Sequence, residues 1–154
     1  MAGQRQARRM ITVEPIGPVT KTMDPIPVVA MLRWAPPFDG RPEPRPMLAV
    51  AWTQAQVLVR RSWPETSTEA WLPARDVHRI HELARPTPAV ARVPAAGGGI
   101  ATVEGQAVAY AIHRGGRHAF AVRVRLAPGT EQEQERWVLP EDLVDADPLD
   151  DVAS

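Results

Sequence analysis

A short motif occurs twice in this chain and constrains its fold more than any other feature. Residues 69–77 read Glu-Ala-Trp-Leu-Pro-Ala-Arg-Asp-Val, and residues 136–144 read Arg-Trp-Val-Leu-Pro-Glu-Asp-Leu-Val. A second matched pair lies upstream of each copy, Ala-Val-Ala-Trp at 49–52 and Ala-Val-Ala-Tyr at 107–110. Two matched features in the same order predict an internal duplication. Each module would then have roughly 55–65 residues, a size that can fold alone with marginal stability.

The composition favours β-structure over helix. The 154 residues include 17 prolines, about twice average usage, and proline interrupts helices. Hydrophobic residues make up 44% of the chain, enough for globular cores. The absence of cysteine excludes disulfides and thiolate metal sites. Arginine far outnumbers lysine, and this resembles the proteins of GC-rich bacterial genomes. We therefore predict a mostly β fold.

Two hairpins are predicted from alternating apolar residues. In residues 47–63, pairing Trp52 with Val57 and Val50 with Val59 places all four side chains on one face. In residues 100–126, the register that unites the apolar sets pairs Ile112 with Phe120, Tyr110 with Val122 and Val108 with Val124, with a glycine bulge near the turn. Residues 73–85 could form either a short helix or a 3₁₀ turn followed by extended chain.

The residues before the first hairpin show three patterns. Residues 1–10 are polar and basic, and could form either a solvated arm or an arm that contacts phosphates. Residues 26–34 predict a strand with Ile26, Val28, Ala30, Leu32 and Trp34 on one face. Residues 35–46 predict a long loop, because prolines and an Asp-Gly pair interrupt them repeatedly.

The predicted organisation has five parts. They are an extended, proline-rich and flexible N-terminal segment (1–25), a first module (26–83), a linker rich in proline, alanine and glycine (84–99), a second module (100–146) and an acidic tail (147–154). The linker is placed there because proline and small residues crowd it and no large apolar side chain could anchor its centre.

Each copy reads as a hairpin, a polar loop, a short apolar strand, Leu-Pro-x-x and a final Val. This resembles the C-terminal half of an SH3-like barrel, in which a proline opens a 3₁₀ turn before the last strand. Residues 57–63 with 71–77, and 121–125 with 138–144, occupy those places. The resemblance implies two tandem SH3-like barrels. The aromatic that usually precedes the final Val is Asp76 in one copy and Leu143 in the other, so the proline-peptide groove of signalling SH3 domains is not expected.

The charge distribution suggests where a partner could bind. The net charge is zero, but residues 1–125 carry 17 basic and 9 acidic side chains, whereas residues 126–154 carry one arginine and nine carboxylates. An acidic tail could fold back on a basic face. No apolar run reaches the roughly 18 residues of a membrane span and no export signal is apparent, so a cytoplasmic protein without membrane contact is expected.

The candidate partner-binding residues are the arginines and exposed aromatics on or beside the two hairpins. They are Arg60, Arg61, Trp63, Arg114, Arg117, Arg123, Arg125 and Trp137. Arg123 and Arg125 share an outward face by strand parity. The alternative interpretation is an ordinary solvated strand surface in an arginine-rich protein.

No catalytic residue, cofactor site or metal site is predicted. The sequence holds no nucleophile-elbow serine and no glycine-rich phosphate loop. His78 and His81 are spaced i, i+3, but two histidines supply too few ligands for a metal. The function expected is therefore a non-enzymatic binding or adaptor protein. The alternative is an accessory protein that binds DNA or RNA through the arginine-bearing hairpins, and a small hydrolase or metal enzyme follows well behind.

Overall fold

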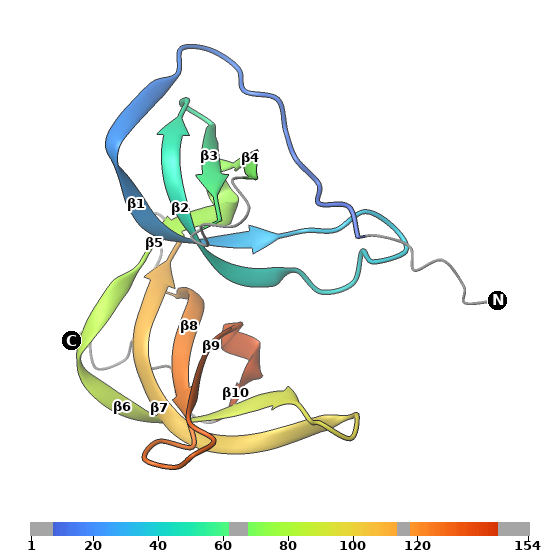
Figure 1. Ribbon diagram of the computed structural model, residues 1–154, viewed down its shortest axis with the longest axis vertical. Helices are drawn as coiled ribbons and strands as arrows, with labels where there is room; N and C mark the ends of the chain where they lie inside the picture. Colours follow the sequence, from blue (N-terminus) through green and yellow to red (C-terminus); the bar gives the residue numbers. More distant parts are fainter. Residues whose placement is uncertain (1–7, 62–67, 114–117, 145–154) are drawn as a thin grey trace. The chain divides into compact units, whose positions relative to one another are not determined.

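The computed structural model describes residues 8–61, 68–113 and 118–144 (Figure 1). They form a mostly β protein, as predicted, and the only helical elements among them are two short 3₁₀ turns. Within these residues no helix has the length and apolar character needed to cross a bilayer. The chain divides into two compact units. The first contains residues up to Ile26 and Ala30–Val77, and the second contains Pro27–Val29 and the residues from His78 onward.

The first sheet has five strands in the order β4-β3-β2-β1-β5. Its elements are β1 (Thr20–Leu32), β2 (Glu43–Trp52), β3 (Gln56–Arg60), β4 (Glu69–Pro73), the 3₁₀ turn η1 (Ala74–Asp76) and β5 (Val77–Arg79). The pairs β2–β3 and β3–β4 are antiparallel. Figure 1 shows β1 as a long curved strand in blue. The sheet is open, with β4 and β5 at its edges.

The second sheet has five strands in the order β10-β6-β7-β8-β9. Its elements are β6 (His81–Pro94), β7 (Ile100–Ile112), β8 (Ala119–Leu126), β9 (Gln134–Val138), the 3₁₀ turn η2 (Pro140–Asp142) and β10 (Leu143–Val144). All neighbouring pairs in this sheet are antiparallel. The order β9-β8-β7-β6-β10 corresponds strand by strand to the order β4-β3-β2-β1-β5 of the first sheet. In both sheets a 3₁₀ turn connects the two strands that come last in the sequence. This sheet is also open, so closed barrels are not shown.

The repeated Leu-Pro motif lies at the equivalent place in both sheets. In each copy the leucine is buried. Pro73 directly precedes the first 3₁₀ turn, and Pro140 is the first residue of the second. Of the two alternatives for residues 73–85, the 3₁₀ turn followed by extended chain is present. Proline suits this place because its fixed φ is compatible with a tight turn and it lacks an N–H that would need a partner.

The predicted registers are partly right. Trp52 pairs with Val57 and Tyr110 with Val122, as expected. A register shift between Ala49 and Ala51 makes Val59 face Ala49 instead of Val50. Shifts in the β7–β8 pair likewise make Ala119 the partner of Ile112. An inserted residue moves every side chain beyond it to the next position, and periodicity alone does not locate such an insertion.

The linker predicted at 84–99 is wrong for residues 84–94, which belong to β6. Ala89, Ala91 and Val93 alternate into the core of the second sheet and are at most 9% exposed. Alternate residues of a strand direct their N–H groups to the same edge. Pro86 and Pro88 are two residues apart, so both missing N–H groups would lie on one edge of β6, and the N–H donors on its other edge remain. The small side chains of this segment therefore belong to a tightly packed strand and not to a linker.

Two further segments were predicted as irregular and are strands. Residues 20–25, assigned to the flexible N-terminal segment, begin β1, and residues 43–46, assigned to a proline-rich loop, begin β2. Pro25 and Pro27, like Pro44 and Pro46, are again two residues apart. The same physical reason applies, because the missing donors of each pair lie on one edge only.

Candidate binding site

The register of the second sheet places four residues of interest in one row across four strands. Glu82 of β6 faces Ala109 of β7, Ala109 faces Arg123 of β8, and Arg123 faces Trp137 of β9. Facing residues in neighbouring strands direct their side chains to the same side of a sheet. Ala109 carries only a methyl group, so the long Arg123 side chain can reach past it to Glu82.

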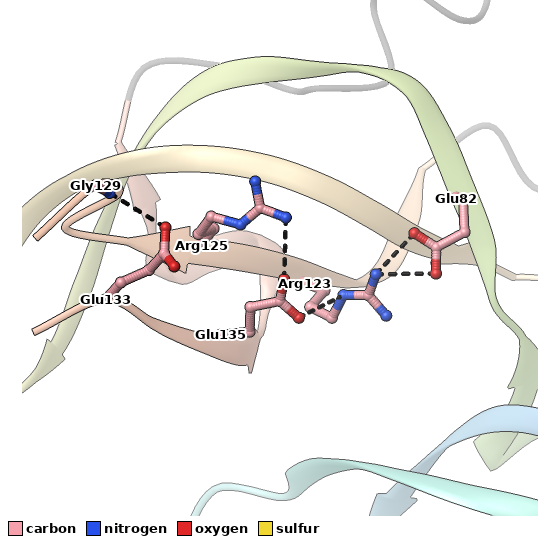
Figure 2. Close-up of polar contacts among 6 residues, drawn as sticks. All are labelled: Glu82, Arg123, Arg125, Gly129, Glu133 and Glu135. Atoms are coloured by element: carbon pink, nitrogen blue, oxygen red, sulfur yellow. Dashed lines mark hydrogen bonds and ion pairs between the residues drawn. The ribbon is translucent and has the colours of Figure 1, made fainter. Parts of the chain in front are cut away.

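Arg123 is held on both sides by carboxylates (Figure 2). Its Nη2 lies 2.9 Å from Oε1 and 2.7 Å from Oε2 of Glu82. Its Nε lies 3.5 Å from Oε2 of Glu135, near enough for an ion pair although too far for a good hydrogen bond. Arg125 Nη2 donates to Oε1 of Glu135 at 3.3 Å. The guanidinium of Arg123 also lies 5.8 Å from the centre of the Trp137 ring.

The structure therefore brings together three of the predicted site residues, Arg123, Arg125 and Trp137, but not as free cations. Glu82 and Glu135 already pair with the two arginines within the second unit. At the adjoining turn, Glu133 accepts the N–H of Gly129, so this carboxylate is engaged locally (Figure 2). An outside anion would have to displace the carboxylates that pair with the arginines.

The first unit contains a hollow of about 270 Å³, which we call the Trp34 hollow. It is lined by Arg8, Leu32, Trp34, Arg45, Pro46, Met47 and Arg61. Trp34 follows the end of β1, and the sequence placed it on the apolar face of that strand. It is only partly buried, and its Nε1 is shielded from solvent without a hydrogen-bond partner in the described residues. The guanidinium of Arg8 lies 4.3 Å from the centre of its ring.

One carboxylate connects two of the arginines at this hollow. Glu43, at the start of β2, accepts from Arg8 Nη1 at 2.7 Å and from Arg45 Nη2 at 3.0 Å. Partial burial alone would raise the pKa of Glu43, but the hydrogen bonds and charges of Arg8 and Arg45 outweigh it, and its pKa is lowered. Glu43 therefore stays ionised at neutral pH and fixes both guanidinium groups.

Of the two predicted arginines at the end of β3, Arg61, which follows the strand, lines the Trp34 hollow and Arg60 does not. Arg60 is half-buried and lies directly opposite Glu69 of β4. Arg61 is exposed, and among the described residues no ion pair involves it. The remaining candidates, Trp63, Arg114 and Arg117, lie outside the described residues.

The histidines gather with aromatic rings on the second unit. His78 lies 5.3 Å from His113 and 4.4 Å from Phe120, measured between ring centres. His81 stacks on Tyr110 at 5.5 Å. Within residues 8–61, 68–113 and 118–144, no three side chains of the metal-binding types lie close enough to hold an ion.

Sequence reasoning missed most of the Trp34 hollow. The alternation of residues 26–34 placed Trp34 on one face of a strand, and the prolines around Glu43 and Arg45 predicted a loop. Arg8 was considered only as part of a solvated or phosphate-binding arm. The available signal was the Arg-Pro-Glu-Pro-Arg-Pro sequence at 41–46, in which charges alternate with proline.

Comparison with known proteins supplies no further guide to this site. No protein-family model, no curated protein and no solved structure matches the chain.

Proposed function

We propose that the protein is a non-enzymatic binding protein, an adaptor, built from two SH3-like modules that arose by internal duplication. Three features support the SH3-like assignment. The two sheets share one element order, each has a 3₁₀ turn between its last two strands, and in each the last strand pairs with the first. The repeated Leu-Pro motif lies at that turn in both.

The residue types of the Trp34 hollow support a protein partner. Its lining consists of three arginines, a tryptophan, a methionine, a leucine and a proline. Tryptophan, methionine and arginine are enriched in protein–protein interfaces, and lysine, aspartate, glutamate and serine are depleted. Buried tryptophan and arginine also contribute most of the binding energy in such interfaces. This hollow is the single observation that carries the proposal.

Site-specific photo-crosslinking in the native host tests it. A photoreactive amino acid at position 61 is expected to give a discrete protein adduct, because Arg61 borders the hollow and is exposed. The matched control is the same replacement at Arg136, an exposed arginine of β9. The adduct should disappear in the Trp34→Ala variant, whose folding is checked by thermal unfolding. Equal adducts from both positions, or none from position 61, would refute the proposal.

Nucleic-acid binding through the hairpin arginines is the alternative, and the ion pairs of Arg123 and Arg125 weigh against it. Contacts with phosphates make affinity fall steeply as salt rises. A gel-shift titration with duplex DNA and single-stranded RNA separates the two functions. A shift at low salt that is abolished by Arg123→Glu with Arg125→Glu would favour nucleic acid over an adaptor role.

A further inference from the structure

The N-terminal arm, defined as residues 8–16, lies on the first unit as an added extended segment. Ile11 N–H donates to the carbonyl of Arg33 at 2.9 Å, and Ala35 N–H donates to the carbonyl of Arg9 at 2.8 Å. These reciprocal bonds form an antiparallel bridge between Met10 and Trp34. The arm thus pairs with the residues that follow β1, in the way that a peptide adds to the edge of a sheet.

The side chain of Arg8 anchors this arm. Its guanidinium stacks on the face of Trp34 and donates to Glu43 at 2.7 Å. Arg45 holds the same carboxylate from its own side, with Nη2 3.0 Å and Nε 3.3 Å from Glu43 Oε2. An aromatic face beside a fixed carboxylate is a receptor for a guanidinium, because the first attracts the cation and the second binds its N–H groups.

The other hydrogen bonds that attach the arm are made by its backbone, and its apolar side chains are exposed or only partly buried, with Met10 and Val13 among the partly buried ones. Ile11 is 48% exposed and Ile16 is 74% exposed. Farther along, Val13 N–H donates to the carbonyl of Trp71 at 3.0 Å, and Ile16 N–H donates to the side-chain oxygen of Gln56 at 3.1 Å. The donors on the arm in these bonds are backbone groups, which any extended segment possesses. Arg8 is the side chain of the arm that pairs with a carboxylate and stacks on an aromatic ring, and it therefore adds specificity to the backbone bonds.

We propose that this surface is a recognition site for an extended, arginine-bearing segment of a partner protein, and that the arm occupies it as an intramolecular competitor. The inference rests on the proposed function and names the partner chemistry for the Trp34 hollow. The guanidinium of Arg8 already lies on Trp34 and pairs with Glu43, so the surface has room for this group. A tethered segment acts at an effective concentration of roughly millimolar, so the partner segment must displace the arm.

Binding of a peptide that copies the arm tests the proposal. The probe is an acetylated, dye-labelled peptide with the sequence of residues 7–15, measured by fluorescence anisotropy. The full chain with Arg8→Gln has lost the anchor of its own arm. It is expected to bind the peptide about 10-fold or more tightly than the unaltered chain does. A peptide with glutamine in place of Arg8 is expected to bind about 10-fold more weakly.

Variants of the receptor complete the test. In the Arg8→Gln chain, adding Glu43→Gln is expected to weaken peptide binding by about 10-fold, since the carboxylate that accepts the guanidinium is neutralised. Glu69→Gln, at an exposed residue of β4, is the matched control and should leave binding unchanged. Thermal unfolding of each variant confirms that it is folded.

Three outcomes would overturn the inference. They are no peptide binding to any variant, equal binding of the arginine and glutamine peptides, and a peptide affinity that Glu43→Gln leaves unchanged. Light scattering addresses a second copy as the occupant, because a dimer that is lost in the Arg8→Gln chain would mean that arms exchange between copies. If the peptide fails to bind while the adduct at position 61 persists, the adaptor function stands and only the arginine recognition falls.

Discussion

Replacing Gly105 with alanine tests how closely β7 and β8 approach in the second sheet. Gly105 lies opposite Ala89 of β6 and Leu126 of β8. A Cβ at this position would lie 2.2 Å from the carbonyl oxygen of Arg125, 3.1 Å from its carbonyl carbon and 3.2 Å from Cα of Leu126. All three are backbone atoms, so no change of rotamer relieves the overlap.

The size of the effect follows from this geometry. The two strands must separate locally by about 1 Å, and overpacking of this kind costs about 1–3 kcal/mol. Weakening the adjacent backbone hydrogen bonds adds about 1 kcal/mol for each bond. Alanine restricts the unfolded chain and recovers about 0.5–1 kcal/mol. The net destabilisation expected is about 2–3 kcal/mol, which lowers the Tm of a unit of this size by about 10–20 °C.

Thermal and urea unfolding, followed by circular dichroism, measure this loss of stability. Gly97→Ala is the matched control, because nothing lies within 4 Å of the Cβ it would add. Its free energy of unfolding should stay within about 0.5 kcal/mol of the unaltered chain. If Gly105→Ala is as stable as Gly97→Ala, the close approach of β7 and β8 described above is wrong.

The remaining predictions concern the first unit. Arg33 donates to both carboxylate oxygens of Asp76 at 3.2 Å; the Asp76 side chain is 6% exposed and that of Arg33 is 51% exposed. Asp76→Asn should therefore lower the free energy of unfolding by about 1 kcal/mol, because the guanidinium of Arg33 can turn to water. Arg33→Met leaves the buried charge of Asp76 unpaired and should lower it by about 2–3 kcal/mol. Urea unfolding that gives the reverse order would contradict this account. Because the pKa of Glu43 is lowered in the folded chain, its contribution to stability is complete above its unfolded pKa of about 4.3 and is lost as pH falls through the folded value. NMR signals of Ile11 should accordingly be unchanged between pH 7 and 5 and report release of the arm only as the pH falls below the usual glutamate range. Glu43→Gln should abolish that pH dependence.

Much of the fold was predictable because it depends on local pattern. The alternation of Val57 with Val59, and of Val122 with Val124, identified β3 and β8, and the Leu-Pro motif located both 3₁₀ turns. The strands that were missed, around residues 43–46 and 84–94, contain prolines two residues apart. Whether a strand tolerates such prolines depends on which edge they face, and the sequence alone does not state the edge.

The candidate site was less predictable, since it depends on residues that are distant along the chain. Arg61 was predicted as a candidate and lines the hollow, but its neighbours there come from the arm, the end of β1 and the start of β2. Arg123 and Arg125 were expected to form an open basic face. Their neutralisation depends on the register that aligns Glu82 with Arg123 across Ala109, and on the pairing of β9 that brings Glu135 beside both.

The amino-acid sequence by itself determined that this protein is mostly β, that a Leu-Pro turn is used twice, and that it lacks cysteine chemistry. These properties follow from composition and from short-range periodicity, which act within a few residues. The tertiary structure alone decided which of the described charged residues pair with one another. Ion pairs such as Arg8–Glu43 and Arg123–Glu82 join residues 35 and 41 positions apart, and only the folded chain brings them within hydrogen-bonding distance.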